Sequence, residues 1–271
     1  MTDGERWTRQ VLVDLRTRGY RPDAWRAFVA ESFERARLDR LAHPHEHRQI
    51  VLVGAIGGCA WLAAAPWSPL VAAIAIVWWL VVVTMLDWHV GMLQRPDGRP
   101  LGGIGAPNLI SLARLGAAPV LVALKPVGIG VAVLICAASD VVDGVLARRH
   151  DLATRLGRWL DGAADGVILV TAVLALTAHG VIAAWVTAIV VARHAAQWAG
   201  VAVGYFARGV APSLDHVVPA RATGAVVVAG IVAAPFARGL GATLIVVGAA
   251  GGVITVALTA RRAFVARPDM L

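Results

Sequence analysis

Acidic residues are scarce in most of this 271-residue sequence, because no glutamate follows Glu46 and only nine aspartates do. Lysine occurs once, at Lys125, so nearly all of the positive charge is arginine. Charged residues make up 15% of the chain, whereas soluble domains contain about 25%. This shortage argues against an ordinary soluble domain, and it makes each carboxylate after Glu46 a candidate for a specific role.

Cysteine is also rare. The two cysteines, Cys59 and Cys136, lie within apolar segments, so we expect them to contribute to packing and expect no disulfide framework. Apolar residues, in contrast, make up 58% of the chain, and the mean hydropathy is +0.70. These values predict an integral membrane protein.

The formal net charge of +8 comes from arginines placed between the apolar segments. They do not form one patch with interleaved aromatic residues, so we expect no nucleic-acid partner. Arginines beside apolar segments are typical of cytosolic loops next to anionic lipid. We therefore expect a multi-pass protein of the inner or plasma membrane that contacts membrane lipids.

Apolar segments follow residue 49, and most of them approach the roughly 20 residues that a spanning helix needs. The sequence therefore predicts an all-α polytopic membrane protein with about eight transmembrane helices. The segments cover residues 49–65, 69–87, 107–124, 127–147, 158–179, 181–206, 218–236 and 240–260.

The distribution of arginine predicts the orientation of these helices, because basic residues concentrate in cytosolic loops. With the N-terminus in the cytosol, the opposite side holds only Lys125 and Arg238. Both termini and the active site are then expected to face the cytosol. The cytosolic segments would hold ten arginines before residue 49, then Arg95, Arg99, Arg148, Arg149, Arg155, Arg158, Arg208, Arg261, Arg262 and Arg267.

The polar N-terminal segment, residues 1–48, contains ten arginines and eight acidic residues. Trp7, Val11 and Leu15 recur at helical spacing, and a second helix is expected from Pro22, since proline is favoured in a first turn. We expect amphipathic helices that lie either on the membrane surface or against the cytosolic face of the protein.

Four of the nine aspartates fall within 26 residues. Asp140 and Asp143 are three positions apart near the end of one expected span, and Asp161 and Asp165 are four apart at the start of the next. Each pair shares one helix face. The short connection makes the two helices antiparallel neighbours, so the pairs can face each other.

Four clustered carboxylates at a membrane boundary repel one another and need protons or cations nearby. Hard divalent cations prefer carboxylate oxygens, so Mg²⁺ or Mn²⁺ fits this set of ligands. The alternative is four charges that reach water at helix ends. Their spacing beside Gly144, Gly157 and an arginine favours the metal site.

These residues resemble the signature of the CDP-alcohol phosphotransferase (CDP-alcohol phosphatidyltransferase) family, Asp-x-x-Asp-Gly-x-x-Ala-Arg followed by Gly-x-x-x-Asp-x-x-x-Asp. Residues 107–262 would form the family's six-helix catalytic core, which includes the stretch from Pro107 to Ser111 with Arg114. The rest would be a cytosolic amphipathic segment at 1–48, two additional transmembrane helices and a cytosolic loop at 49–106, and a cytosolic tail at 263–271. The signature positions here are Asp140, Asp143, Gly144, Ala147, Arg148, Gly157, Asp161 and Asp165.

The resemblance implies a homodimeric transferase that cleaves the pyrophosphate of a CDP-linked donor, releases CMP and passes the phosphoalcohol to a second alcohol. It implies two divalent ions, Mg²⁺ or Mn²⁺, held by Asp140, Asp143 and Asp161. Asp165 would orient or deprotonate the acceptor hydroxyl, and it would also touch a metal. The residues matched to nucleotide contacts are Gly144, Ala147, Arg148 and Gly157.

CDP-diacylglycerol is the expected donor, which would make the protein a phosphatidyltransferase of phospholipid biosynthesis. Arg193 lies mid-span, and Arg221 starts the next span. Both are expected to bind an anionic acceptor such as glycerol phosphate or inositol phosphate. A structural ion pair for Arg193 and a membrane anchor for Arg221 are the simpler alternatives. A neutral alcohol acceptor remains an alternative as well.

Three other functions compete with this interpretation. A soluble CDP-alcohol with a lipid acceptor would reverse the two substrates. A membrane prenyltransferase also uses aspartate-rich motifs, but these lack the Gly-x-x-Ala-Arg continuation. A cation or proton transporter would use intramembrane carboxylates, but transporters often repeat their halves, and here the acids occupy one helical hairpin.

Overall fold

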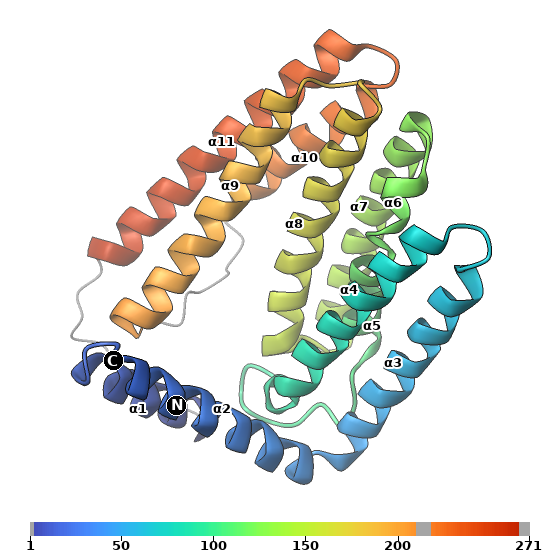
Figure 1. Ribbon diagram of the computed structural model, residues 1–271. Helices are drawn as coiled ribbons and strands as arrows, with labels where there is room; N and C mark the ends of the chain where they lie inside the picture. The colour runs from blue at the N-terminus through green and yellow to red at the C-terminus, as the bar shows by residue number, and fades with distance from the viewer. Residues whose placement is uncertain (1–2, 210–217, 266–271) are drawn as a thin grey trace. The chain divides into compact units, whose positions relative to one another are not determined.

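The computed structural model describes residues 3–209 and 218–265, and its elements within these ranges are helices (Figure 1). An isolated bridge pairs Gln94 with Pro100. The α-helices are α1 (Asp3–Thr17), α2 (Pro22–Ala42), α3 (Pro44–Ala64), α4 (Pro69–Trp88), α5 (Ala106–Ala117), α6 (Val120–Ala123), α7 (Pro126–Arg149), α8 (Arg155–Ala178), α9 (Ala184–Val203), α10 (Val218–Ala233) and α11 (Arg238–Val265), with a 3-10 turn η1 (Val90–Met92) and a π-helical turn η2 (Gly204–Arg208).

Six stretches of helix among the described residues are long and apolar enough to cross a membrane, so the prediction of an all-α, multi-pass membrane protein is confirmed. The exact count of eight is not. The six stretches are Pro69–Trp88, Ala106–Ala123, Pro126–Arg149, Arg155–Ala178, Ala184–Ala207 and Arg238–Thr255.

The two other expected spans fall on α3 and α10. Helix α3 has 21 residues, but its first turns are polar, from His45 to Gln49, and this leaves too short an apolar stretch. The apolar part of α10, Arg221–Ala233, is itself shorter than a spanning helix. In both cases the apolar part is shorter than the helix that contains it, and only the length of the apolar part determines whether a helix can span a membrane.

The chain divides into two compact units. Among the described residues, the first unit comprises 3–119, 139–164 and 205–209, and the second comprises 120–138, 165–204 and 218–265. The proposed boundaries at 48, 106 and 262 stay predictions. Of the expected C-terminal tail, residues 266–271 lie outside the described residues.

Two tryptophans of α4 connect this helix to α3 and α5 in the first unit. The indole Nε1 of Trp79 donates to the carbonyl oxygen of Gly54 on α3 over 2.8 Å. Trp78 Nε1 donates to the carbonyl oxygen of Leu115 on α5 over 2.7 Å. Gly116 leaves room for the Trp79 ring against α5, because a Cβ there would lie 2.8 Å from Cζ3. The location of α5 therefore depends on α4, which precedes the expected catalytic core.

Helix α2 packs on the protein and also exposes apolar side chains. On its packed side, the Phe33 ring lies 4.2 Å from the Trp88 ring of α4, and Trp25 lies 5.3 Å from Phe206. Yet Phe33 is 54% exposed and Leu41 66% exposed. An apolar strip of this kind is typical of a helix that lies in a membrane interface.

Glycines bring α10 and α11 of the second unit into close contact. A Cβ on Gly248 would lie 2.8 Å from the carbonyl oxygen of Thr223 and 2.9 Å from the backbone nitrogen of Val227. A Cβ on Gly230 would similarly lie 2.7 Å from the nitrogen of Ile245. Small residues at such positions allow helix backbones to approach in a membrane.

This packing predicts that Gly248→Ala destabilises the protein, because the added methyl group meets backbone atoms that cannot rotate away. Overpacking of this kind typically costs about 1–3 kcal/mol. The matched control is Gly224→Ala on α10, where an added Cβ has no atom within 4 Å and helix propensity favours alanine. Melting temperatures of the detergent-purified variants test this, and equal values for the two would contradict it.

Candidate active site

Three buried polar residues form a stripe on α5. Asn108, Ser111 and Arg114 follow one another at three-residue spacing, so they share one face of the helix. Their exposed fractions are 2%, 0% and 5%. Buried polar groups need partners, and these three find theirs on α7, on α8 and in the connection before α8.

Arg114 is at the centre of the aspartate cluster. Its Nη1 lies 2.9 Å from Asp140 Oδ1, and its Nη2 lies 2.7 Å from Asp143 Oδ2. Asp161 Oδ1 is 3.7 Å from the same Nη2. One guanidinium from α5 therefore contacts both carboxylates of α7 and the first carboxylate of α8.

Ser111 connects the same two helices. Its Oγ lies 3.2 Å from Asp143 Oδ2 and 2.5 Å from Asp161 Oδ1. A hydroxyl group has one proton to donate, so Ser111 can serve one of these carboxylates at a time. Asp143 is buried, while the side chains of Asp140 and Asp161 are 42% and 33% exposed. The cluster is therefore buried at Asp143 and more open to solvent at Asp140 and Asp161.

The charge of this cluster fits a hard cation. Three carboxylates face one guanidinium, which gives a formal charge of −2 if all are ionised. Carboxylate oxygens are the ligands that Mg²⁺ and Mn²⁺ prefer. Among the described residues, however, no three His, Cys, Asp or Glu side chains lie close enough together to hold an ion. Arg114 occupies the space on which the carboxylates converge.

Asn108 fixes the start of α8. Thr154 precedes the first residue of α8, and its Oγ1 accepts a hydrogen bond from the Gly157 N–H over 2.8 Å, as an N-cap residue does. Asn108 Nδ2 donates to that Oγ1 over 3.1 Å. A Cβ on Gly157 would collide with Asn108 Oδ1 and lie 3.0 Å from Thr154 Oγ1. The absence of a side chain at Gly157 allows this contact, which sets the register of Asp161 one turn later.

The remaining signature residues of α7 lie in the last two turns of that helix. Arg148 is exposed, and its guanidinium lies over Gly144, where a Cβ would be 3.2 Å from Nη1. Ala147 accepts a hydrogen bond from Leu152 N–H, over 2.9 Å, as the helix ends. A small residue at 144 therefore leaves the guanidinium room to lie along α7.

Asp165, Arg193 and Arg221 belong to the second unit. Asp165 lies on α8, four residues after Asp161, and is partly exposed. Arg221 lies on α10 with an exposed side chain. Their expected roles stay predictions.

Arg193 is buried within α9. Its exposed fraction is 8%, and its Nε and Nη1 have no hydrogen-bond partner among the described residues. The guanidinium packs against Gly252 of α11, where an added Cβ would overlap it. A buried guanidinium whose donors lack acceptors is suited to an anionic ligand.

The family model for CDP-alcohol phosphatidyltransferases matches residues 105–260, which is more than half of the chain. The protein belongs to this family. It is also similar to cardiolipin synthase (CMP-forming) of Streptomyces coelicolor (strain ATCC BAA-471 / A3(2) / M145), with 36% identity over 99 residues that cover 33% of this chain and 46% of that protein. The matched region thus spans less than half of that relative, and no solved structure matches the chain.

The structure adds residues to which the sequence alone assigned no role. Arg114, Ser111 and Asn108 lie inside the region matched by the CDP-alcohol phosphatidyltransferase model. Arg114 and Ser111 contact signature aspartates, and Asn108 contacts Thr154, the N-cap residue of α8. Their spacing on an apolar helix was a signal for a buried polar face. Thr154, by contrast, lies in a connection and has no such periodic signal.

The geometry predicts that Arg114→Gln destabilises the protein in EDTA, because Asp143 would lose its buried counter-charge. Removing one partner of a buried ion pair costs about 3–5 kcal/mol, and the partial exposure of Asp140 and Asp161 should bring the loss toward the lower figure. Melting temperature in mild detergent is the measurement. Arg149→Gln on the exposed side of α7 is the matched control, and a melting temperature for Arg114→Gln equal to this control would contradict the central role of Arg114.

Proposed function

We propose that this protein transfers a phosphatidyl group from CDP-diacylglycerol to an alcohol and releases CMP, as an enzyme of phospholipid biosynthesis. The contacts of Asp140, Asp143 and Asp161 with one guanidinium, that of Arg114, bring three signature carboxylates into one cluster, and this cluster carries the proposal. The family match over residues 105–260 supports it. The name of the Streptomyces relative describes a CMP-forming reaction, and we infer the same leaving group here.

Asp140, Asp143 and Asp161 would hold the two divalent ions, Mg²⁺ or Mn²⁺, that the family implies. When bound, such ions neutralise the charge of a pyrophosphate and stabilise the leaving phosphate oxygen. The net negative charge of the cluster and its carboxylate donors support this assignment. Arg114 would have to give up some of its contacts with these carboxylates for them to act as ligands.

Asp165 would act on the acceptor. In the proposed reaction, the acceptor hydroxyl oxygen forms a bond to the phosphorus that carries the diacylglycerol. The bond from that phosphorus to the oxygen of CMP breaks, and CMP leaves with the electron pair. The hydroxyl proton passes to Asp165. Arg148, with Gly144, Ala147 and Gly157, would bind the nucleotide, since an exposed arginine fork suits a phosphate.

Arg193 and Arg221 are proposed to bind the acceptor when it carries a phosphate. The buried, unpartnered Nε and Nη1 of Arg193 support an anionic ligand better than a structural ion pair. For Arg221, whose side chain is exposed, the support is the sequence position alone. We further propose a homodimer in which both termini and the nucleotide site face the cytosol.

The experiment is to incubate the purified protein with CDP-diacylglycerol and a panel of acceptors, and to measure CMP. The panel contains glycerol phosphate, inositol phosphate, a neutral alcohol and phosphatidylglycerol, which would yield cardiolipin. CMP release should require Mg²⁺ or Mn²⁺ and stop in EDTA. In sealed membranes, CMP should appear outside inverted vesicles and inside right-side-out vesicles.

Three outcomes would contradict this proposal. Turnover in metal-free buffer would exclude the two-metal site. Activity with a soluble CDP-alcohol and a lipid acceptor, but not with CDP-diacylglycerol, would reverse the substrates. Reaction with a prenyl diphosphate alone would favour the prenyltransferase alternative.

The roles within the aspartate set predict different defects in two variants. Asp165→Asn removes the proton acceptor but keeps the size of the side chain, so donor binding should survive while turnover falls by about 10²–10⁴-fold. Asp161→Asn should instead weaken metal binding and, through it, donor binding. The measurements are donor affinity, metal affinity and the single-turnover rate for each variant. If both variants lost donor affinity equally, Asp165 would have to be read as one more metal ligand.

A further inference from the structure

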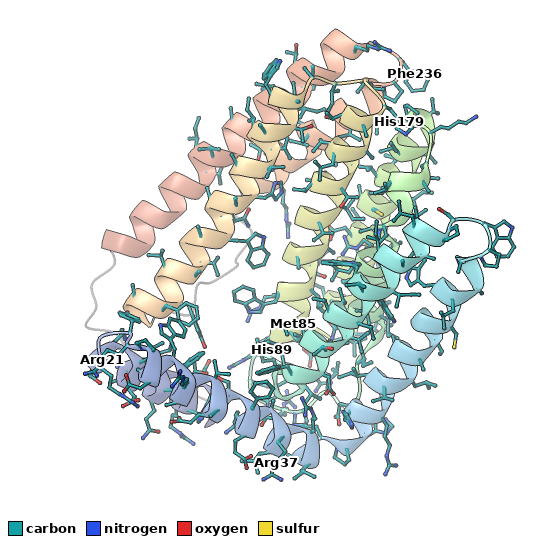
Figure 2. The ribbon with its side chains drawn as sticks, viewed as in Figure 1. Arg21, Arg37, Met85, His89, His179 and Phe236 are labelled. Carbon is teal, nitrogen blue, oxygen red and sulfur yellow. The ribbon has the colours of Figure 1, made fainter. Side chains whose placement is uncertain are left out.

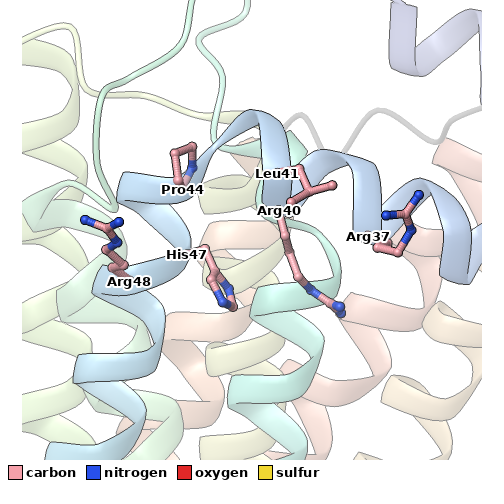
Figure 3. A pocket seen from close by; sticks show the side chains of 6 residues that line it. All are labelled: Arg37, Arg40, Leu41, Pro44, His47 and Arg48. Atoms are coloured by element: carbon pink, nitrogen blue, oxygen red, sulfur yellow. The ribbon is translucent and has the colours of Figure 1, made fainter.

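A pocket with basic walls lies where α2 turns into α3, within the first unit, and none of its lining residues belongs to the aspartate cluster. Its volume is about 360 Å³, within the range of about 300–1,000 Å³ that is usual for small-molecule sites. Figure 3 shows Arg40 and His47 extending side by side, with Arg37 and Arg48 at the two ends of the row. The lining residues are Arg37, Arg40, Leu41, Pro44, His47 and Arg48.

The periodicity of the two helices brings these residues together. Arg37, Arg40 and Leu41 stand at positions i, i+3 and i+4 of α2, and Pro44, His47 and Arg48 repeat the spacing on α3. Each set therefore forms one helix face. Because a single residue, His43, separates α2 from α3, the two faces meet at the turn.

Asp87, near the end of α4, holds the two central side chains. Its Oδ2 lies 2.7 Å from Arg40 Nε, and its Oδ1 lies 2.6 Å from His47 Nδ1. The contact of Arg40 with Asp87 is ionic, since the Nε of Arg40 makes no hydrogen bond among the described residues. The terminal Nη atoms of Arg40 lie outside this contact and can donate to a ligand. Asp87 thus orients the basic groups without being part of the pocket lining.

The pocket keeps an excess of positive charge after its internal pairs are counted. Arg37 pairs with Glu34 over 2.6 Å, and Arg40 pairs with Asp87. Arg48 is exposed and has no ion-pair partner among the residues that the structure describes. Three arginines against two carboxylates leave an excess of positive charge, and the guanidinium of Arg48 offers a fork that suits a phosphate.

The surroundings of the pocket resemble a membrane interface more than an open water surface. Asp87 and Trp88 end the apolar helix Pro69–Trp88, so the pocket lies at the level where a spanning helix stops. Leu41 lines the pocket and is 66% exposed, and Leu38 beside it is 48% exposed. Figure 2 shows Arg37 projecting from the end of α2 that leads into α3. A soluble anion would leave these leucines exposed to water, whereas the acyl chains of a lipid would cover them.

We propose that this pocket binds the phosphate of an anionic phospholipid headgroup, at a site separate from the catalytic aspartates. The arginines would hold the phosphodiester, and Leu41 would contact the first part of the acyl chains. Bound lipid would join α2, α3 and the end of α4 at the membrane surface. The proposal does not depend on the metal site. Phosphatidylglycerol is also a candidate acceptor, so the test compares variants of the pocket, which lie outside the aspartate cluster.

The test uses the intact, detergent-purified protein and native mass spectrometry, with phosphatidylglycerol titrated as the probe. The variant Arg37→Gln/Arg48→Gln removes two exposed charges from the pocket and leaves Arg40, His47 and Asp87 in place. The dissociation constant should rise by about fivefold for each arginine removed, and this difference should shrink as salt is added. Phosphatidylcholine should bind more weakly and show no difference between variant and parent.

The matched control is Arg21→Gln/Arg26→Gln, which removes two exposed charges from the other end of α2, where Figure 2 places Arg21. It should leave phosphatidylglycerol affinity unchanged. Equal losses in the two variants would mean general attraction to an anionic surface and would overturn the site. Full displacement of the lipid by an equal concentration of glycerol phosphate or inorganic phosphate would mean a soluble anion, and would overturn the lipid as its ligand. The melting temperatures of both variants show whether they remain folded.

Discussion

A charged cluster with a buried member inside helices that cross a membrane has to be balanced by its own neighbours, because a buried charge is poorly solvated. In this protein the balance depends on Arg114, which contacts Asp140, Asp143 and Asp161 from a third helix. Breaking one side of such a buried pair leaves a charge that the surroundings cannot solvate. The relative positions of α5, α7 and the start of α8 are therefore tied to these ionic contacts.

The remaining contacts of the first unit hold Arg114 in place. The N-cap at Thr154, fixed by Asn108, sets where α8 begins and so where Asp161 points. On the other side of α5, Trp78 donates to the carbonyl of Leu115. These are neutral hydrogen bonds with defined directions, and they constrain helix register more tightly than apolar contacts can. The phosphate transfer proposed above would benefit from this rigidity.

The family match begins at residue 105, where Gly105 has a φ of +80° just before α5. Helices α1–α4 lie outside that match, yet they are not simply appended to the core. Helix α4 binds α5 through its two tryptophans, and it supplies Asp87 to the basic pocket between α2 and α3. The N-terminal helices thus contact both the first helix of the matched region and the basic pocket.

Sequence alone determined the membrane class and the family, and it singled out the four aspartates as a candidate site, because these depend on composition and on spacings within single helices. The motif at Asp140 and Asp161 could be recognised since its residues lie close together in the chain. Tertiary structure decided which side chains meet across helices: that Arg114 lies between the carboxylates, and that α2 and α3 form a pocket. It also decided where helices end, so that α3 and α10 fell short of the expected spans. Spacing along one helix is fixed by its geometry, but a partner on another helix depends on packing that no local pattern specifies.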